Sequence, residues 1–177
     1  MKRVIWSALI LFMVMQLSAV LWQAIKYESI IYFGKTLYLA ILPIDPYDAF
    51  RGRYIRLDFA DDYVYATDDI KNNKELFVTF ITEDGISKPY EIFNSKPNTD
   101  EPYLKIKNYY KSYDGIHISY PFKRFYMQED SVIKADRNNI FNNNNVVAAV
   151  KVLDGVGVLS DIMINSISIN KYMQEQE

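Results

Sequence analysis

The apolar positions divide the chain into one long N-terminal run and a series of short alternating segments. Residues 4–25 carry no charge, and their clearly polar members are Ser7, Gln16, Ser18 and Gln23. At 1.5 Å per residue in a helix, a run of this length crosses a hydrocarbon core of about 30 Å. The pattern therefore predicts a transmembrane helix from Val4 to Ile25, in contact with the lipid bilayer.

A cleaved signal peptide is the alternative interpretation of this run. The apolar region of a signal peptide usually has about 7–15 residues and ends in a small-x-small cleavage site. The run here is longer, and cleavage after Ala24 would put the bulky Trp22 at the −3 position. We therefore expect an uncleaved anchor. Because Lys2 and Arg3 precede it, residues 1–3 are expected in the cytoplasm and the rest of the chain outside the inner membrane, a periplasmic or otherwise extracytoplasmic location.

The rest of the chain has the two-residue alternation of β-strands. After an expected juxtamembrane linker at residues 26–34, residues 35–44 are apolar on both faces, which predicts a strand in the centre of a sheet. Residues 53–59 alternate between polar and apolar side chains, so we expect Leu57 and its alternate neighbours to face the core.

Three later stretches predict β-hairpins, because each contains two strand-like segments around an Asp-Gly turn. A short helix is expected at residues 131–139, after an N-cap at Asp130 or Ser131. Repeated hairpins with little helix predict a mainly β domain over residues 35–177, an antiparallel barrel or sandwich with one short helix. The expected hairpins cover residues 76–93, 103–122 and 146–169.

The composition narrows the classes of function. The chain is 50% hydrophobic with 15 tyrosines and 10 phenylalanines, which favours a packed body over disorder. The formal net charge is −2, and without Lys2 and Arg3 it is 18 − 22 = −4, which argues against nucleic acid as a partner. The chain has no cysteine, so disulfides, a thiol nucleophile and cysteine metal sites are excluded. We expect no cofactor.

The segment 42–59 concentrates the most unusual local chemistry. Asp45 precedes a proline, which predicts a β-turn, and Gly52 permits a close approach or a positive φ. Asp48 and Arg51 lie between them, and an arginine inside such a bend can hold a carboxylate with two hydrogen bonds. The turn is either a salt-bridged structural loop or a contact point for a membrane partner. If it faces the bilayer, its arginines would instead meet lipid headgroups.

Residues 52–59, Gly-Arg-Tyr-Ile-Arg-Leu-Asp-Phe, resemble the motif of the GDYXXLXY proteins, a family of small membrane-anchored bacterial proteins. Residues 45–51 resemble the segment that precedes this motif, and Arg124-Phe125-Tyr126 with Glu129 resembles a second family segment. Two positions depart from the motif, Arg53 in place of Asp and Phe59 in place of the final Tyr. The resemblance and the turn single out, as binding or structural residues, Asp45, Asp48, Arg51, Gly52, Tyr54, Leu57, Arg124, Tyr126 and Glu129.

Other reactive residue types carry weaker signals. His117 is the single histidine and lies in a strand pattern, which favours a half-exposed strand residue over a zinc ligand. The pair Asp61-Asp62 lacks the spacing of a calcium loop and is interpreted as solvated turn residues. Ser131 and Lys134 have the S-x-x-K spacing of serine–lysine hydrolases, but the other elements of those enzymes are incomplete. The many aromatic residues near positions 109–126 fit core and cross-strand pairs, with a stacking platform as the alternative.

These observations predict a single-pass inner-membrane protein whose β-domain acts in assembly or regulation with another envelope protein. The resemblance implies an integral membrane protein as the leading partner, because family members are often encoded beside multi-pass membrane proteins. No catalytic residue is assigned, and a non-enzymatic role is favoured. Two alternatives stay open: an envelope hydrolase using Ser131 and Lys134 or the carboxylates of the Asp45 turn, and a barrel that binds a small ligand or a glycan.

Overall fold

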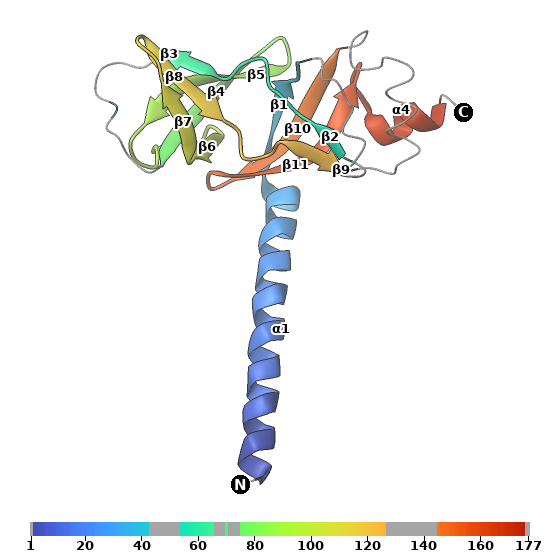
Figure 1. Ribbon diagram of the computed structural model, residues 1–177. Helices are drawn as coiled ribbons and strands as arrows, with labels where there is room; N and C mark the ends of the chain where they lie inside the picture. The colour runs from blue at the N-terminus through green and yellow to red at the C-terminus, as the bar shows by residue number, and fades with distance from the viewer. Residues whose placement is uncertain (1, 43–53, 66–69, 71–74, 127–144, 176–177) are drawn as a thin grey trace.

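The computed structural model describes residues 2–42, 54–65, 70, 75–126 and 145–175. One long helix, α1 (Lys2–Phe33), projects from an elongated body of β-strands (Figure 1). Its 32 residues correspond to about 48 Å, and residues 26–33 continue the helix beyond the predicted span. Among the described helices it is the one long and apolar enough to cross a membrane.

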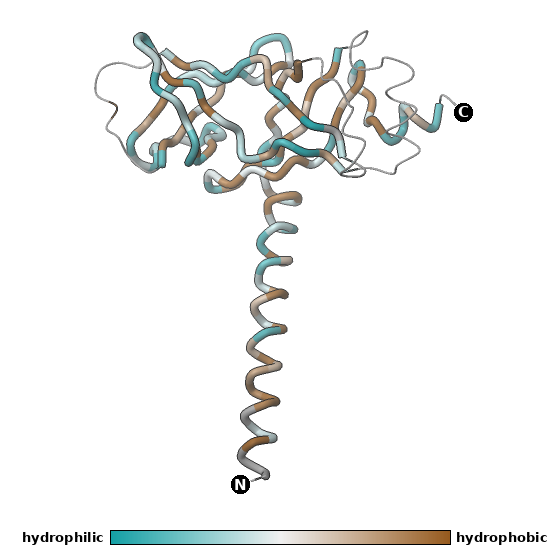
Figure 2. The backbone as a smooth tube through the Cα atoms, viewed as in Figure 1, coloured by the Kyte–Doolittle hydropathy of each residue, from teal (hydrophilic) through white to brown (hydrophobic). Residues whose placement is uncertain are grey.

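Apolar residues occur on all sides of α1, and they are exposed over most of its length (Figure 2). At its end the helix is fixed to the β-body. Ile30 is buried, and the backbone N–H of Gly34 donates to the carbonyl of Ile30 at 2.9 Å. A Cβ at position 34 would lie 2.3 Å from that carbonyl oxygen and 3.0 Å from the backbone nitrogen of Val152, so the close approach requires glycine.

The first sheet has the strand order β1-β10-β11-β12, and all its pairs are antiparallel. The predicted hairpin at its centre is confirmed, with Asp154 and Gly155 at positive φ in the turn. Its second strand is shorter than predicted, because the chain reverses after Ile164 and forms the C-terminal helix α4. These elements are β1 (Lys35–Ala40), β10 (Val146–Leu153), β11 (Val156–Ile164), β12 (Ile167–Ser168) and α4 (Ile169–Glu175).

The prediction that the first strand is central in its sheet is wrong. β1 is an edge strand of this sheet, and only one of its faces is buried, with Leu37 and Leu39 inside and Tyr38 exposed. The edge of β1 that does not pair with β10 lies beside β5 (Ile86–Phe93), where the backbone N–H of Tyr38 donates to the Ser87 hydroxyl at 3.1 Å. A side chain therefore replaces a backbone rung between the two sheets.

Two three-stranded antiparallel sheets form the other half of the body, with the orders β5-β4-β6 and β3-β8-β7. The predicted strand from residue 103 to 110 is divided between them, because β6 pairs with β4 whereas β7 pairs with β8. The hairpins formed by β4–β5 and β7–β8 are confirmed. The strands are β3 (Tyr63–Tyr65), β4 (Leu76–Glu83), β5 (Ile86–Phe93), β6 (Tyr103–Ile106), β7 (Asn108–Lys111) and β8 (Gly115–Ser119).

The core consists of two adjoining clusters of buried side chains. The larger one lies between the β1–β10 strands and the two three-stranded sheets, and the smaller one lies beneath α4. Ile41, Phe59 and Leu159 are partly buried and pack against both clusters. The predicted fold class is confirmed: a mainly β, antiparallel body follows one long apolar helix. The described short helix is at the C-terminus, whereas the one expected at residues 131–139 lies outside the described residues.

Candidate functional site

The structure describes four of the nine residues singled out from the sequence. Tyr54, Leu57, Arg124 and Tyr126 are described. The Asp45 turn and its salt-bridge hypothesis stay predictions, as does the Ser131–Lys134 pair. Outside the described residues lie Asp45, Asp48, Arg51, Gly52, Glu129, Ser131 and Lys134.

The two segments that resemble the family pair directly with each other. β2 (Tyr54–Arg56) and β9 (Arg124–Tyr126) form an antiparallel ribbon in which Tyr54 lies opposite Tyr126 and Arg56 lies opposite Arg124. One more rung extends the pairing, because the backbone N–H of Leu57 donates to the carbonyl of Lys123 at 2.9 Å. Segments about 70 residues apart in sequence thus share one small surface.

The outer face of this ribbon is aromatic and basic. The rings of Tyr54 and Tyr126 are 5.8 Å apart, and the guanidinium of Arg124 lies 4.7 Å above the Tyr54 ring. Arg56 and Arg124 are both exposed, and Arg56 Nε is 3.9 Å from Asp58 Oδ2, which is too long for a hydrogen bond. We name these four residues, Tyr54, Arg56, Arg124 and Tyr126, the motif face.

The inner face of the same ribbon belongs to the core. Leu57 is 1% exposed and belongs to the smaller buried cluster, and Phe125 packs against that cluster. Phe59, where the motif has its final Tyr, is half-buried with its ring 4.6 Å from that of Tyr120. The motif therefore alternates between an exposed face and a structural one, as the sequence pattern predicts.

The ribbon continues beyond the motif. The backbone N–H of Ile118 donates to the carbonyl of Asp62 at 2.7 Å, and β3 and β8 follow with Tyr63 opposite His117 and Tyr65 opposite Gly115. The same number of residues separates the two ends on both strands. The pairing of residues 54–56 with 124–126 and the pairing of residues 63–65 with 115–117 therefore belong to one register. The described rungs are interrupted only in between, across residues 58–61. We call the whole element the split ribbon.

Two features keep the middle of the split ribbon open. Pro121, on the β8–β9 side, has no backbone N–H to donate to a rung. On the other side, the backbone of residues 58–60 bonds to the end of β1 instead: Leu42 N–H donates to the Asp58 carbonyl at 2.9 Å, and Ala60 N–H donates to the Ala40 carbonyl at 3.1 Å. Residues 58–60 therefore bond to the end of β1, and the bonds to the β8–β9 segment resume at Asp62.

The buried positions of the split ribbon also change between its ends. Near β2 the buried side chain is Leu57, and near β3 it is Val64. On the partner strand, Phe125 packs inward at one end and Ile116 at the other. Alternate residues of a strand point to opposite faces, so the set of positions that is buried changes from odd to even numbers between β2 and β3. The change falls in the open middle, where residues 58–61 have no rung to the partner strand.

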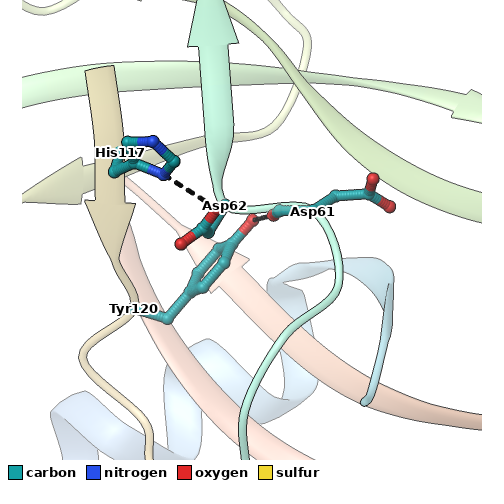
Figure 3. A network of polar contacts seen from close by, with 4 residues as sticks. All are labelled: Asp61, Asp62, His117 and Tyr120. Atoms are coloured by element: carbon teal, nitrogen blue, oxygen red, sulfur yellow. Dashed lines mark hydrogen bonds and ion pairs between the residues drawn. The ribbon is translucent and has the colours of Figure 1, made fainter. Parts of the chain in front are cut away.

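An open depression of about 310 Å³ lies at the split. Phe59 and Tyr120 line it together with Asp62, and the Tyr120 hydroxyl donates to the carbonyl of Asp61 at 2.7 Å (Figure 3). Burial, with the two aspartates close by, raises the pKa of Tyr120 far above its ordinary value, so this hydroxyl stays protonated. The other charged groups at its wall are those of Asp58 and Lys123.

His117 takes part in this site, which the sequence did not reveal. Its Nδ1 lies 3.2 Å from Asp62 Oδ1, and both side chains are half-exposed (Figure 3). The expectation of a half-exposed strand residue is confirmed, but Asp62 is a partner of the imidazole as well as a turn residue. The contact joins residues 55 positions apart and is diagonal, because His117 lies opposite Tyr63, the neighbour of Asp62, so only the register of the split ribbon reveals it. The described residues contain no group of three or more acidic or histidine side chains arranged to hold a metal ion.

The fold and the site define a class of protein: a mainly β domain on a long apolar N-terminal helix, with a motif-bearing ribbon at its surface. The family model described as GDYXXLXY protein matches residues 16–162, and the chain therefore belongs to the GDYXXLXY family. The matched region includes the complete split ribbon. No curated protein and no solved structure gives a significant match.

Proposed function

We propose that this protein is a single-pass membrane protein that assembles with an integral membrane protein through its motif face. In this proposal α1 crosses the inner membrane from a cytoplasmic N-terminus, and the β-domain lies outside. The observation that carries the proposal is the pairing of β2 with β9, which joins the two family segments into one exposed surface.

The chemistry of the motif face suits a protein interface. Tyrosine and arginine are enriched among the residues that contribute most to binding, because they combine a large contact area with polar ends. Arg124 is already held against Tyr54, so less conformational entropy is lost when it binds. Like charges directly opposite each other destabilise a strand pair, and Arg56 lies opposite Arg124. A carboxylate from the partner would remove this repulsion, so we expect an acidic segment there.

Two glutamines in α1 support a partner that also spans the membrane. Gln16 and Gln23 are seven residues apart, about two helical turns, and therefore lie on the same side of the helix. Both are exposed, and Gln16 lies in the middle region of the predicted span. An amide in hydrocarbon lacks water to bond with, so a polar group on a neighbouring helix is its favourable partner.

The orientation of the chain is tested with a single introduced cysteine, because the natural sequence has none. Tyr90 is 60% exposed on β5, away from the motif face, so Tyr90→Cys is a suitable position. Labelling by a membrane-impermeant maleimide in cells with intact inner membranes is expected. Labelling only after lysis would place the domain in the cytoplasm and contradict the proposed topology.

The partner is tested by affinity capture of the full-length protein from gently solubilised membranes. One integral membrane protein should co-purify with the natural chain and be reduced at least tenfold by the double substitution Arg56→Ala/Arg124→Ala, since charged interface contacts are worth about 1–3 kcal/mol each. Lys107→Ala, which removes an exposed charge elsewhere, is the matched control. Gln16→Leu separates the contribution of the helix.

The capture experiment tests both the contact surface and the assembly itself. If the same protein co-purifies equally with the double variant, the motif face is not the contact. If no integral membrane protein is enriched over the control in any sample, the assembly proposal is wrong. Thermal unfolding of the double variant serves as the folding control, and a change of less than about 1 kcal/mol is expected because both side chains are exposed.

A further inference from the structure

The second exposed surface of the split ribbon lies on the three-stranded sheet β3-β8-β7, far from the motif face along the body (Figure 1). The register places Tyr63, His117 and Tyr110 in one row across its three strands. Tyr65 follows Tyr63 on the same side of β3. These side chains face away from the core, because Val64, Ile116 and Ile118 of the alternate positions are buried.

Aromatic rings dominate this row. The ring of Tyr63 lies 5.0 Å from that of Tyr65 and 5.0 Å from the imidazole of His117, which is 6.3 Å from the ring of Tyr110. Tyr65 is 80% exposed and Tyr110 is 70% exposed. Such rings are rarely left open in numbers on a strand face that only needs to be solvated.

Gly115 allows this arrangement. A Cβ at this position would lie 2.5 Å from the hydroxyl oxygen and 2.6 Å from Cζ of Tyr63, so the Tyr63 ring occupies the space that a side chain on β8 would fill. The ring therefore lies across the sheet, and Tyr65 meets it edge to face at an interplanar angle of 86°. Gly115 thus leaves room on the outer face of β8 for the rings of Tyr63 and Tyr65.

Hydrogen-bonding groups border the rings. Asp62 and His117 meet at 3.2 Å, which holds the imidazole in place, and Ser119 with its strand neighbour Asn108 continues the outward row. Asp62 and Ser119 also line the depression at the split. The row of rings and polar groups, which we call the track, therefore leads from β3 to the open depression of about 310 Å³, which it meets at Asp62 and Ser119.

We infer that this track binds an uncharged glycan chain. The faces of pyranose rings carry C–H groups that stack on aromatic rings, while their hydroxyls bond to carboxylate, imidazole and hydroxyl groups at the rim. The carboxylates near the track disfavour anionic ligands, such as nucleic acids, that also stack on tyrosine rings. Asp58 and Asp62 line the depression together with Lys123, so two carboxylates face one ammonium group and phosphate or uronate groups are disfavoured there, whereas a nucleic acid site needs a positive groove. The inference does not depend on the proposed membrane partner, which uses the opposite end of the split ribbon.

The test uses the full-length protein in lipid nanodiscs, so that no sugar detergent competes. The probes are the β-1,4-linked hexasaccharides of N-acetylglucosamine and of glucose, with hexagalacturonate as the anionic comparison, and binding is measured by titration calorimetry. At least one neutral hexasaccharide is expected to bind, and hexagalacturonate is not. Tyr65→Ala and Tyr110→Ala should each weaken the binding roughly tenfold, the loss of one stacked ring.

Matched variants make each result decisive. Tyr90→Ala removes another exposed tyrosine, 60% exposed on β5, and should leave binding unchanged, as should Arg124→Ala on the motif face. Asp62→Asn keeps the shape of the site and should weaken binding by removing the carboxylate. The inference is overturned if neither neutral probe binds, if hexagalacturonate binds more tightly than both, or if the tyrosine substitutions at positions 65 and 110 change nothing.

Discussion

The two ends of the split ribbon have one register but present different chemistry to the solvent. At the β2–β9 end the outward row contains Arg56 opposite Arg124, beside two tyrosines. At the β3–β8 end the outward row contains Tyr63 opposite His117, with Asp62 next to them. One ribbon therefore displays a basic surface and a neutral to acidic one.

The difference follows from the change of buried positions at the split. Pairing register is a property of the backbone, whereas surface chemistry depends on which alternate side chains point outward. Leu57 is odd-numbered and Val64 is even-numbered, yet both are buried, so a different alternate set of residues is exposed at each end. Substitutions at the two ends and at the split test this explanation.

The largest effect is expected at the buried side of the motif face. Leu57→Ala should lower the free energy of unfolding by about 3 kcal/mol, because it removes a 1%-exposed side chain and leaves a cavity. Hydrogen exchange should show the loss of protection to be greatest in β2 and β9. Leu42→Ala is the control: Leu42 lines the same depression but is 45% exposed, so less than about 1 kcal/mol is expected. Equal losses in both variants would mean that Leu57 does not anchor this end.

The next largest effect is expected at the opposite end. Gly115→Ala should cost about 2 kcal/mol, because the new Cβ would lie 2.4 Å from the carbonyl oxygen of Val64 and would also displace the Tyr63 ring. The loss should appear as reduced protection of β3 while β2 and β9 stay protected. Stability is measured by chemical denaturation. A variant as stable as the natural chain would show that β3 and β8 can separate enough to admit a Cβ at position 115 without loss of free energy.

A smaller effect is expected at the split itself. Tyr120→Phe removes the hydrogen bond to the Asp61 carbonyl and should lower the free energy of unfolding by about 1 kcal/mol. Because Asp61 lies in the interrupted part of the ribbon, the amide signals of both ends should change in NMR spectra. If only one end responds, the split does not couple the two surfaces.

The smallest effect is a pH dependence at the aromatic end. Burial and the nearby Asp114 raise the pKa of Tyr63 from 10.0 to about 12. The folded state therefore favours the neutral phenol, so its contribution to stability is complete below pH 10 and is lost as the pH rises from about 10 to about 12. The difference in absorbance near 295 nm between the natural chain and Tyr63→Phe should have its midpoint near pH 12. A midpoint near pH 10 would show that the Tyr63 ring lies in open solvent.

Some features of the fold follow from local sequence signals. The Asp-Gly turns locate the β4–β5 and β10–β11 hairpins, since each needs residues that accept a positive φ, and Asp84 and Gly85 both adopt one. The alternation in residues 53–59 correctly assigned Leu57 to the core. These predictions succeeded because a turn or an alternating strand is specified by neighbours in the sequence.

Other features depend on residues far apart in sequence. The strand expected at residues 103–110 divides after Ile106, because its first part completes one sheet and its second part begins another. The first strand is an edge strand of its sheet, and on its unpaired side the Tyr38 N–H donates to the hydroxyl of Ser87, 49 residues away, and not to a strand carbonyl. The C-terminal helix packs on β11, so its apolar residues Ile169 and Met173 gain their burial only from the assembled core.

The sequence by itself determined the class of the protein: a long apolar helix, an antiparallel β-domain and membership of the GDYXXLXY family, since each of these rests on local composition, alternation or a short motif. Only the tertiary structure decided what the motif contacts. The pairing of Tyr54 with Tyr126 and the meeting of Asp62 with His117 depend on one register between distant segments, and on the packing of those segments against two adjoining core clusters. Register and burial are set by the packing of the whole domain, and no single segment contains that information.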